Sequence, residues 1–597
     1  MPSYSENGKR CAESFQSGQC SGPQDRPIKK HRVHSDSHSA VKPDSDVFGR
    51  ASDELLIRIL SFVPLLDLVH HVSRVCRRLH RLSSDSQIWR QLYYTRFVLP
   101  RALRIPGFQP RASQASGICT RTVMRHGGVD LQKSQARGEP VHWKRQYKLR
   151  HNWSQGKCAV EELDVGTWRR GRHPSSRETL AKVADGMAVT ADADFGLRAW
   201  DLKTKRLLAE ADLTPRRPTC LAVDDQRLLS GELGIAVGFQ DGAFSLWVFG
   251  LGGGVLHRWY SHSPPFPATE KLTELAFSSP YLMTASEDVV VSLYHIESSP
   301  ISPILGRTTG IAKEVEQEQS GEREESGRVP GEDEAGSRVA TERKVMGQPP
   351  KPTLKLITSL KSHSSQEPLA LAIRKMGSSS VASIAFTVAT RDGWTLGIQD
   401  LHIRNSMHDS KPVAEVFNSR LAHAAPLETM TPRRLPSNPA NRRQDLSWSP
   451  LDQNREHPTA ICYSHPYLLA TLPDNTLVLY LCTSNADTLS ISRGIRLWGH
   501  TSGIADAEIT SRGKAVSVSL RGDEVRVWEL EGRLGGKSVE IRPSTASTAT
   551  ANDEEKSECR LGEWDDKRNW VGFDDEMVIV LKESKAGKES LVVYDFT

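Results

Sequence analysis

The side chains that could carry out covalent chemistry are few and widely spaced along the 597 residues. The sequence has no Walker-type phosphate loop, no Gly-x-Ser-x-Gly turn and no His-Glu-x-x-His pair. Its nine cysteines form no Cys-x-x-Cys pair, and an odd, scattered set is typical of reduced thiols. Five stand in apolar surroundings where we expect small core side chains: Cys76, Cys158, Cys220, Cys462 and Cys482. We therefore expect a protein that is not an enzyme.

Three arginines at related positions are the best candidates for binding a ligand. Arg198 and Arg526 each lie two residues before a tryptophan, and Arg496 lies two before Trp498. A guanidinium group binds phosphate through two parallel hydrogen bonds and stays charged at every cellular pH. These residues could therefore bind a phosphorylated protein. The alternative is that they alternate outward on strands and pair with neighbouring carboxylates.

No metal or cofactor is expected. His31, His34 and His38 lie in a polar tail, which does not preorganise a metal site. The glycine-rich stretch 250–254 follows a strand pattern, so it predicts a flexible hairpin rather than a nucleotide cradle.

A sequence repeat extends over most of the chain. The aromatic residues Trp200, Trp247 and Tyr294 are spaced by 47 residues, and each follows an acidic turn residue by six. The same phase returns at four later positions, which are Ile398, Tyr480, Trp528 and Tyr594. Short apolar runs separated by Asp, Gly and Ser predict strands and turns. Seven such units predict sheets packed around an axis.

The sixth unit resembles WD repeats most clearly, because only there does Gly499-His500 precede Trp528-Glu529. The sequence thus predicts a mainly β protein, a WD-repeat-like β-propeller of about seven blades over 157–597. Tyr594 lies close to Thr597, so the last blade lacks an outer strand, which we expect residues 157–163 to supply. Polar insertions at 300–352 and 403–457 predict disordered loops, and a third polar loop is expected at 533–562.

A small all-α module is predicted before the propeller, over 46–97. Ser52 suits an N-cap, and apolar residues recur with helical spacing until Pro64. A second helix is expected from Asp67 and a third after Asp85. About fifty residues cannot bury all this apolar surface, so part of it is expected to contact another chain.

The module contains the motifs Glu54-Leu55-Leu56-x-x-Ile59-Leu60, Pro64-Leu65-x-Asp67-Leu68, Val75-Cys76-Arg77-x-Leu79 and Ile88-Trp89. In these motifs it resembles the F-box, with Ala51-Ser52 where that family usually has Leu-Pro. The resemblance implies binding to the small adaptor of a cullin-RING ubiquitin ligase of the SCF type. The adaptor-binding residues it implies are Leu55, Leu56, Ile59, Leu60, Pro64, Leu68, Val75, Cys76, Leu79, Ile88 and Trp89. The alternative is an ordinary three-helix subdomain docked on its own chain.

Together these resemblances are to fungal-type F-box/WD-repeat proteins, and they imply a substrate receptor whose partners are the adaptor, the cullin and a protein substrate. Two alternative functions are compatible with the same fold: a scaffold in assembly or trafficking, and a propeller associated with RNA or chromatin. The latter rests on basic residues interleaved with Trp143 and Tyr147, within a linker and connecting helix over 98–156. We favour a helix that packs its rings on a neighbouring domain.

Charge and hydropathy set the remaining limits. The net charge of +6 is small for this length and does not predict nucleic-acid binding. No apolar run is long enough for a membrane span or placed as a signal peptide. Residues 1–45 lack hydrophobic periodicity and are expected to be a disordered tail with a basic patch at 29–32. We expect the protein in the cytoplasm, the nucleus or both.

Overall fold

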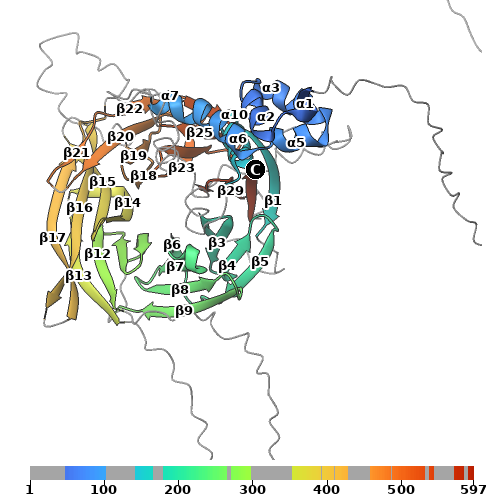
Figure 1. The fold of residues 1–597 in the computed structure, drawn as a ribbon. Coiled ribbons are helices and arrows are strands. Elements are labelled where there is room, and N and C mark those ends of the chain that lie inside the picture. The colour runs from blue at the N-terminus through green and yellow to red at the C-terminus, as the bar shows by residue number, and fades with distance from the viewer. Residues whose placement is uncertain are drawn as a thin grey trace, which may run out of the picture.

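The computed structural model describes residues 47–102, 141–165, 179–264, 270–297, 353–362, 364–390, 393–408, 411–427, 457–485, 487–530, 537–543, 570–583 and 589–597. The tail, most of the linker and the insertion at 300–352 lie outside these ranges. Within them, a ring of strands encloses a central opening, and the N-terminal helices lie at its rim (Figure 1).

Seven antiparallel sheets form the ring, and we number these blades in chain order. Blades 1 to 3 comprise β2 Leu180–Ala184, β3 Met187–Asp192, β4 Gly196–Asp201 and β5 Arg206–Ala211; β6 Pro218–Asp224, β7 Glu232–Phe239, β8 Phe244–Gly250 and β9 Val255–His262; and β10 Leu272–Ser278, β11 Tyr281–Ser286, β12 Val290–Glu297 and β13 Thr353–Lys361. A short 3-10 helix, η3 (Leu228–Ser230), lies between β6 and β7.

Blades 4 to 6 follow the same plan. They comprise β14 Ser365–Met376, β15 Ser379–Thr390, β16 Gly393–His408 and β17 Lys411–His423; β18 Ala460–Ser464, β19 Tyr467–Thr471, β20 Leu477–Ser484, β21 Leu489–Ile491 and β22 Ile495–Leu497; and β23 Ile504–Ile509, β24 Lys514–Ser519, β25 Val525–Glu529 and β26 Lys537–Glu540. Both β21 and β22 pair with β20, so the outer strand of blade 5 is divided.

Blade 7 joins the two ends of the propeller. Its strands are β28 Trp570–Phe573, β29 Met577–Glu583, β30 Glu589–Asp595 and, outermost, β1 Lys157–Asp164. Ala159 to Asp164 pair antiparallel with Asp595 to Ser590, which confirms the predicted closure of the ring. The short strand β27 (Arg542–Pro543) then pairs in parallel with β1.

The repeat phase is confirmed in every blade. Each of the seven repeat residues lies on the third strand of its blade: Trp200 on β4, Trp247 on β8, Tyr294 on β12, Ile398 on β16, Tyr480 on β20, Trp528 on β25 and Tyr594 on β30. Seven hydrophobic cores each take residues from two neighbouring blades. Burial between blades therefore holds the ring together.

Two predicted loops contain strands. The insertion expected from residue 403 instead continues β16 to His408, and β17 pairs with it from Lys411 to His423. Strand β26 lies within a stretch, 533–562, expected to be a polar loop. The expectation of a loop was wrong at 403–408 and 411–423, because cross-strand pairing stabilises a segment whose own apolar alternation is weak. Residues 424–427 belong to no strand, and residues 409–410 and 428–456 lie outside the described residues.

The helices before the propeller are short. They comprise α1 Val47–Arg50, α2 Asp53–Leu60, α3 Leu65–Asp67, the π-helical turn η1 Leu68–Val72, α4 Ser73–Val75, α5 Arg77–Ser83, α6 Ser86–Tyr93, a second π-helical turn η2 Tyr94–Val98, and α7 Leu99–Ala102. The longer α10 (Trp143–Gln155) then leads into β1. None of the described helices is long and apolar enough to cross a bilayer.

Candidate functional site

The start of α2 is fixed by a cap and an arginine. The Ser52 hydroxyl accepts a hydrogen bond from the Leu55 amide at 3.4 Å. Arg78 donates to the Asp53 carboxylate at 2.7 and 2.9 Å and to the Ala51 carbonyl at 2.6 Å. These hydrogen bonds hold the pKa of Asp53 below its usual value. Arg78 thus joins α5 to the N-terminus of α2.

The second predicted helix is interrupted. The backbone of Cys76 is extended, and its sulfur accepts a hydrogen bond from the Leu79 amide at 3.4 Å as the N-cap of α5. Cys76 is exposed, so the expectation of a core side chain was wrong for this cysteine. Pro64 does not end α2, which stops at Leu60, but starts the following helix α3.

The eleven predicted adaptor-binding residues fall into two groups. Five are buried and form the core of the module, namely Leu56, Leu60, Leu68, Ile88 and Trp89. Five others are exposed, namely Leu55, Ile59, Pro64, Val75 and Cys76, while Leu79 is half-buried. The buried group shapes the module, and only the exposed group is available to another chain.

The exposed group continues beyond the predicted residues. The exposed fractions are 60% for Leu55, 51% for Ile59, 71% for Phe62, 69% for Leu66 and 70% for Val75. We call these five residues the docking face. Phe62 and Leu66 were missed from the sequence, although Leu55, Ile59 and Phe62 recur at helical spacing and form a second apolar stripe on and just after α2. Large apolar side chains exposed in this number mark a binding surface.

The first half of α10 packs on the F-box-like helices. The ring of Tyr147 lies 5.4 Å from that of Trp89, edge to face, and Trp143 lies 5.6 Å from Tyr93. Arg96 donates to the Tyr147 hydroxyl at 2.6 Å. The preferred interpretation of this segment, a connecting helix with its rings packed inward, is confirmed.

The second half of α10 packs on blades 6 and 7. Trp153 stacks on Phe596 at 4.0 Å, and its indole N–H donates to the Asp575 carbonyl at 2.9 Å. The Lys514 ammonium lies 3.7 Å from the centre of the Trp153 ring. Gly156 then ends the helix in a left-handed conformation. One helix therefore links the module to the propeller through packed rings at both ends.

Arg198, a predicted substrate-binding residue, is part of the interior of blade 1. It is 6% exposed, donates to the Asp192 carboxylate at 3.0 Å, and reaches the Val165 carbonyl at 2.8 Å. Burial lowers its pKa, against the opposing effect of Asp192. A ligand could reach this guanidinium only if the blade opened.

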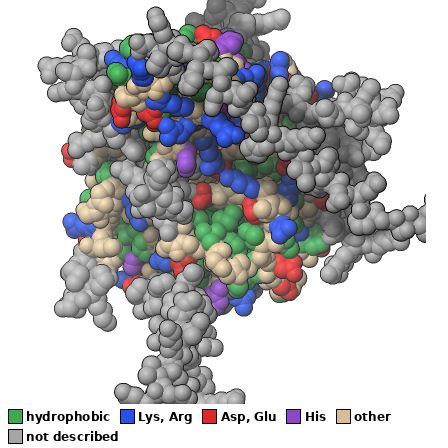
Figure 2. All heavy atoms as spheres, turned by 45° about the vertical axis from the view of Figure 1, so that its right-hand side comes forward, with side chains coloured by type: hydrophobic (Ala, Val, Ile, Leu, Met, Phe, Trp, Pro, Cys, Tyr) green, Lys and Arg blue, Asp and Glu red, His purple; other side chains and the backbone are tan. Residues whose placement is uncertain are grey.

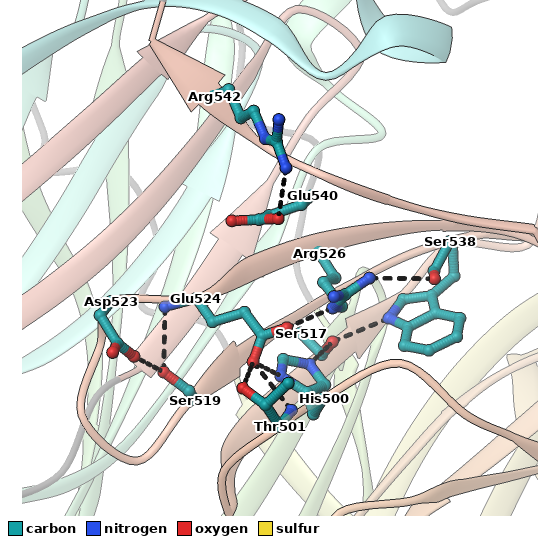
Figure 3. Close-up of polar contacts among 11 residues, drawn as sticks. His500, Thr501, Ser517, Ser519, Asp523, Glu524, Arg526, Ser538, Glu540 and Arg542 are labelled. Atoms are coloured by element: carbon teal, nitrogen blue, oxygen red, sulfur yellow. Dashed lines mark hydrogen bonds and ion pairs between the residues drawn. The ribbon is translucent and has the colours of Figure 1, made fainter.

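Arg526 belongs to a polar network in blade 6 (Figure 3). Its Nε donates to the Glu524 carboxylate at 2.5 Å, and another nitrogen donates to Ser538 at 3.2 Å. The same carboxylate accepts from the Thr501 amide at 3.1 Å. Arg526 and the Gly-His segment at 499–500 are thus tied together by Glu524.

Arg496 lies on the outer strand of blade 5. It pairs with Asp474 and donates to the Thr476 hydroxyl at 3.2 Å. Its guanidinium also lies 5.7 Å from the ring of Trp498. All three predicted arginines therefore pair with carboxylates of their own blades, which agrees with the alternative interpretation. The three residues belong to blades 1, 5 and 6. Phosphate binding by them stays a prediction.

Two family comparisons bear on this arrangement of helices and blades. An F-box-like model matches residues 53–95. A model described as the F-box protein pof12 beta-propeller matches residues 158–597, well over half of the chain. The chain belongs to the F-box protein pof12 beta-propeller family. Its N-terminal module is accordingly called the F-box below.

Solved structures resemble this pof12-type chain only distantly. A computationally designed protein, Ika8, is 15% identical, with 70% of this chain and 83% of that chain covered, at a TM-score of 0.32. The propeller domain of Cps50 (Swd1) from Myceliophteria thermophila is 10% identical, with 71% and 100% covered, at 0.35. U3-55K is also 10% identical, with 73% and 98% covered, at 0.34. These scores carry no argument about function, and a comparison with curated proteins finds no match.

The first strands of the blades enclose a central cavity of about 350 Å³. Its lining includes Lys182, Glu274, Asp506, Glu508 and Glu589. Burial raises the pKa of Glu274 and of Glu508 to about 7, and Asp506 adds to both shifts. Within the described ranges no group of His, Cys, Asp and Glu side chains is arranged to hold a metal ion.

The four propeller cysteines that the structure describes lie inside the blades. Cys158, Cys220 and Cys482 are buried, and Cys462 is half-buried. Burial raises the pKa of Cys158 and of Cys482 to about 12, so both thiols stay protonated at neutral pH. None of these residues has the thiolate character of a nucleophile.

Proposed function

We propose that this chain is the substrate-receptor subunit of a cullin-RING ubiquitin ligase, acting in the cytoplasm or the nucleus. The observation that carries the proposal is the docking face on an F-box that a family model matches. The small adaptor subunit would cover this face, and the propeller would hold the protein substrate. The chain would contribute no reactive group, because proximity to a conjugating enzyme raises the effective concentration of a substrate lysine.

A receptor that works by proximity gains from a fixed distance between its two binding surfaces. The rings of α10 pack on the F-box at one end and on Phe596 at the other. Charged contacts accompany this packing, including an ion pair between Arg145 and Glu576. These contacts support a receptor whose propeller is held in one orientation relative to the adaptor.

The substrate surface is proposed on the propeller face opposite α10. Helix α10 contacts the turns that join first and second strands, at Lys514 and Asp575. The opposite edge of the same blades exposes Trp498 and Leu520. Exposed Trp with a neighbouring Arg is a frequent composition of binding hot spots. Substrates captured by the wild-type chain should be lost from Trp498→Ala but kept by Arg206→Ala, and equal capture would contradict this placement.

A direct test can show whether substrate binding requires phosphorylation of the substrate. Phosphate at Arg496 or Arg526 would have to displace Asp474 or Glu524. If arginines bind phosphate, phosphatase treatment of captured partners should weaken their binding. Binding that survives this treatment would instead indicate recognition of an unphosphorylated motif.

The adaptor contact is tested by exposed residues. Leu55→Asp together with Ile59→Asp places two charges in an apolar contact, and we expect the loss of adaptor co-purification with an unchanged Tm. Leu56→Asp with Leu60→Asp would not separate binding from folding, because both residues are buried. Leu207→Asp with Leu208→Asp, also exposed but on blade 1, is the matched control.

Two outcomes would redirect the proposal. Full adaptor recovery with the Leu55/Ile59 variant would contradict the F-box interface. Recovery of the adaptor without cullin would favour the scaffold function over the ligase.

A further inference from the structure

Positive charge is concentrated in the F-box and α10. Residues 47–102 contain nine arginines and four carboxylates, while α10 contains four Lys and Arg residues and no carboxylate. This excess of nine charges is larger than the +6 of the whole chain, so the remainder is net negative. Figure 2 brings this side of the molecule forward, and Lys and Arg side chains gather in its upper half.

Most of the carboxylates in the F-box have internal roles. Asp53 binds Arg78 and Arg81, and Asp85 caps α6 by accepting from the Gln87 amide at 2.8 Å. Asp67 lies 3.0 Å from His71. Few acidic groups are thus left to balance the remaining arginines.

Three exposed arginines form what we call the basic rim: Arg58, Arg74 and Arg77. In the described part of the chain, none of the three makes an ion pair. Arg58 lies on the same side of α2 as Leu55 and Ile59, and its guanidinium is 4.8 Å from the centre of the Phe62 ring. Arg74 directly precedes Val75 in the sequence, and Arg77 follows it by two residues at the start of α5. The basic rim therefore borders the docking face.

We propose that the basic rim binds carboxylates on an acidic surface of the adaptor, and this inference rests on the proposed function. A partner that covers Leu55, Ile59 and Phe62 must also desolvate part of Arg58. Desolvating an unpaired charge is costly, so the partner has to supply the opposite charge at the edge of its apolar contact. Such rim charges act mainly on the association rate and on its salt dependence.

Nucleic acid is the other polyanion that an arginine cluster could bind. The position of the arginines favours a protein, because phosphate groups would leave the exposed Leu55, Ile59 and Leu66 in contact with water. A protein surface covers apolar and charged groups together.

The experiment measures association of the full chain with the purified adaptor at low and high salt. Arg58→Glu, Arg74→Glu and Arg77→Glu are combined, and Arg206→Glu, an exposed arginine on blade 1, is the matched control. At an ionic strength of about 0.05 M we expect the triple variant to associate about tenfold more slowly than wild type. At about 0.5 M the difference should nearly vanish, because screening removes it. Arg206→Glu should behave as wild type.

Three results would overturn the inference, and they are distinguishable. Equal association rates and salt dependence for the triple variant and wild type overturn it while leaving the proposed function intact. No adaptor binding by the wild-type chain at either salt overturns both. Loss of binding to a single-stranded RNA probe, with adaptor association unchanged, assigns the basic rim to nucleic acid. The triple glutamine variant, expected to show an intermediate rate, controls for misfolding caused by the new carboxylates.

Discussion

The basic rim of the F-box and the carboxylate-bound arginines of the propeller use the same side chain in opposite ways. In the propeller, Arg198, Arg374 and Arg526 each form an ion pair with a carboxylate of the propeller itself. In the F-box, Arg58 and Arg74 lie among exposed apolar side chains. An arginine held by an internal carboxylate stabilises a blade, whereas one beside an exposed Leu or Phe suits a partner. Residue type alone does not separate the two uses.

The largest expected effect comes from breaking a satisfied site in the propeller. Asp400 is 0% exposed and accepts hydrogen bonds from Ser383 at 2.6 Å, Ser484 at 2.5 Å and Arg374 at 3.2 Å. Asp400→Ala leaves the half-buried Arg374 guanidinium without its carboxylate and removes the acceptor of the Ser383 and Ser484 hydroxyls, which should cost about 3–5 kcal/mol of stability. Thermal unfolding should show a clear loss of Tm. Asp225→Ala, an exposed aspartate on blade 2, should leave Tm unchanged.

A similar loss in both aspartate variants would contradict the distinction between satisfied and exposed charges. Asp400→Asn sharpens the test, because it removes the charge and keeps one of the two acceptor oxygens. Its cost should be smaller, about 1–3 kcal/mol.

A smaller effect is expected where the two regions join. Gly156 has φ +67°, and a Cβ there would clash with the Glu540 carbonyl and lie 2.9 Å from Val539. Gly156→Ala should therefore cost about 1–3 kcal/mol from backbone strain alone. Gly186→Ala is the matched control, since it has φ +76° with nothing within 4 Å of the added carbon.

The two glycine variants separate strain from contact. If Gly156→Ala lowers Tm no more than Gly186→Ala does, the close approach of β26 to the end of α10 contributes nothing to stability. A larger loss for Gly156→Ala would support the rigid connection between the F-box and the propeller.

The sequence predicted the blades better than it predicted the surfaces. The spacing of 47 residues located the third strands, because each blade needs a bulky side chain at an equivalent buried position. The closing strand at 157–163 followed from an unpaired edge beside Tyr594. Strand β17 was missed because its apolar Phe417 and Leu421 are exposed while Asn418 and Arg420 are half-buried, so apolar residues do not mark a buried face.

The adaptor-binding residues were predicted as a motif, and a motif combines core and surface positions. Leu55 and Leu56 are neighbours in sequence, yet one is exposed and the other buried. The packing of α2 against η1, α5 and α6 separates them. The partners of Arg198 and Arg526 were also hidden, because strand register decides which carboxylate lies beside each guanidinium.

The smallest effect is expected in the central cavity, where the propeller itself keeps excess charge. The carboxyls of Glu274 and Glu508 have a pKa of about 7 in the folded protein, against 4.5 as the reference value. Between these pH values the folded state binds more protons than the unfolded state, so stability should fall as pH rises from 4.5 to 7 and stay level above that.

Glu274→Gln with Glu508→Gln removes both groups. Its Tm should therefore exceed that of wild type at pH 8, with a difference that vanishes near pH 4.5. Both carboxyls are partly accessible to water in the cavity, so we expect a gain of only ~1 kcal/mol after screening. Glu297→Gln, an exposed glutamate, should follow the wild-type pH profile. A double variant with the same profile would mean that Lys182 already compensates the cavity carboxylates, which would leave the F-box as the region where the described part of the chain carries unbalanced charge.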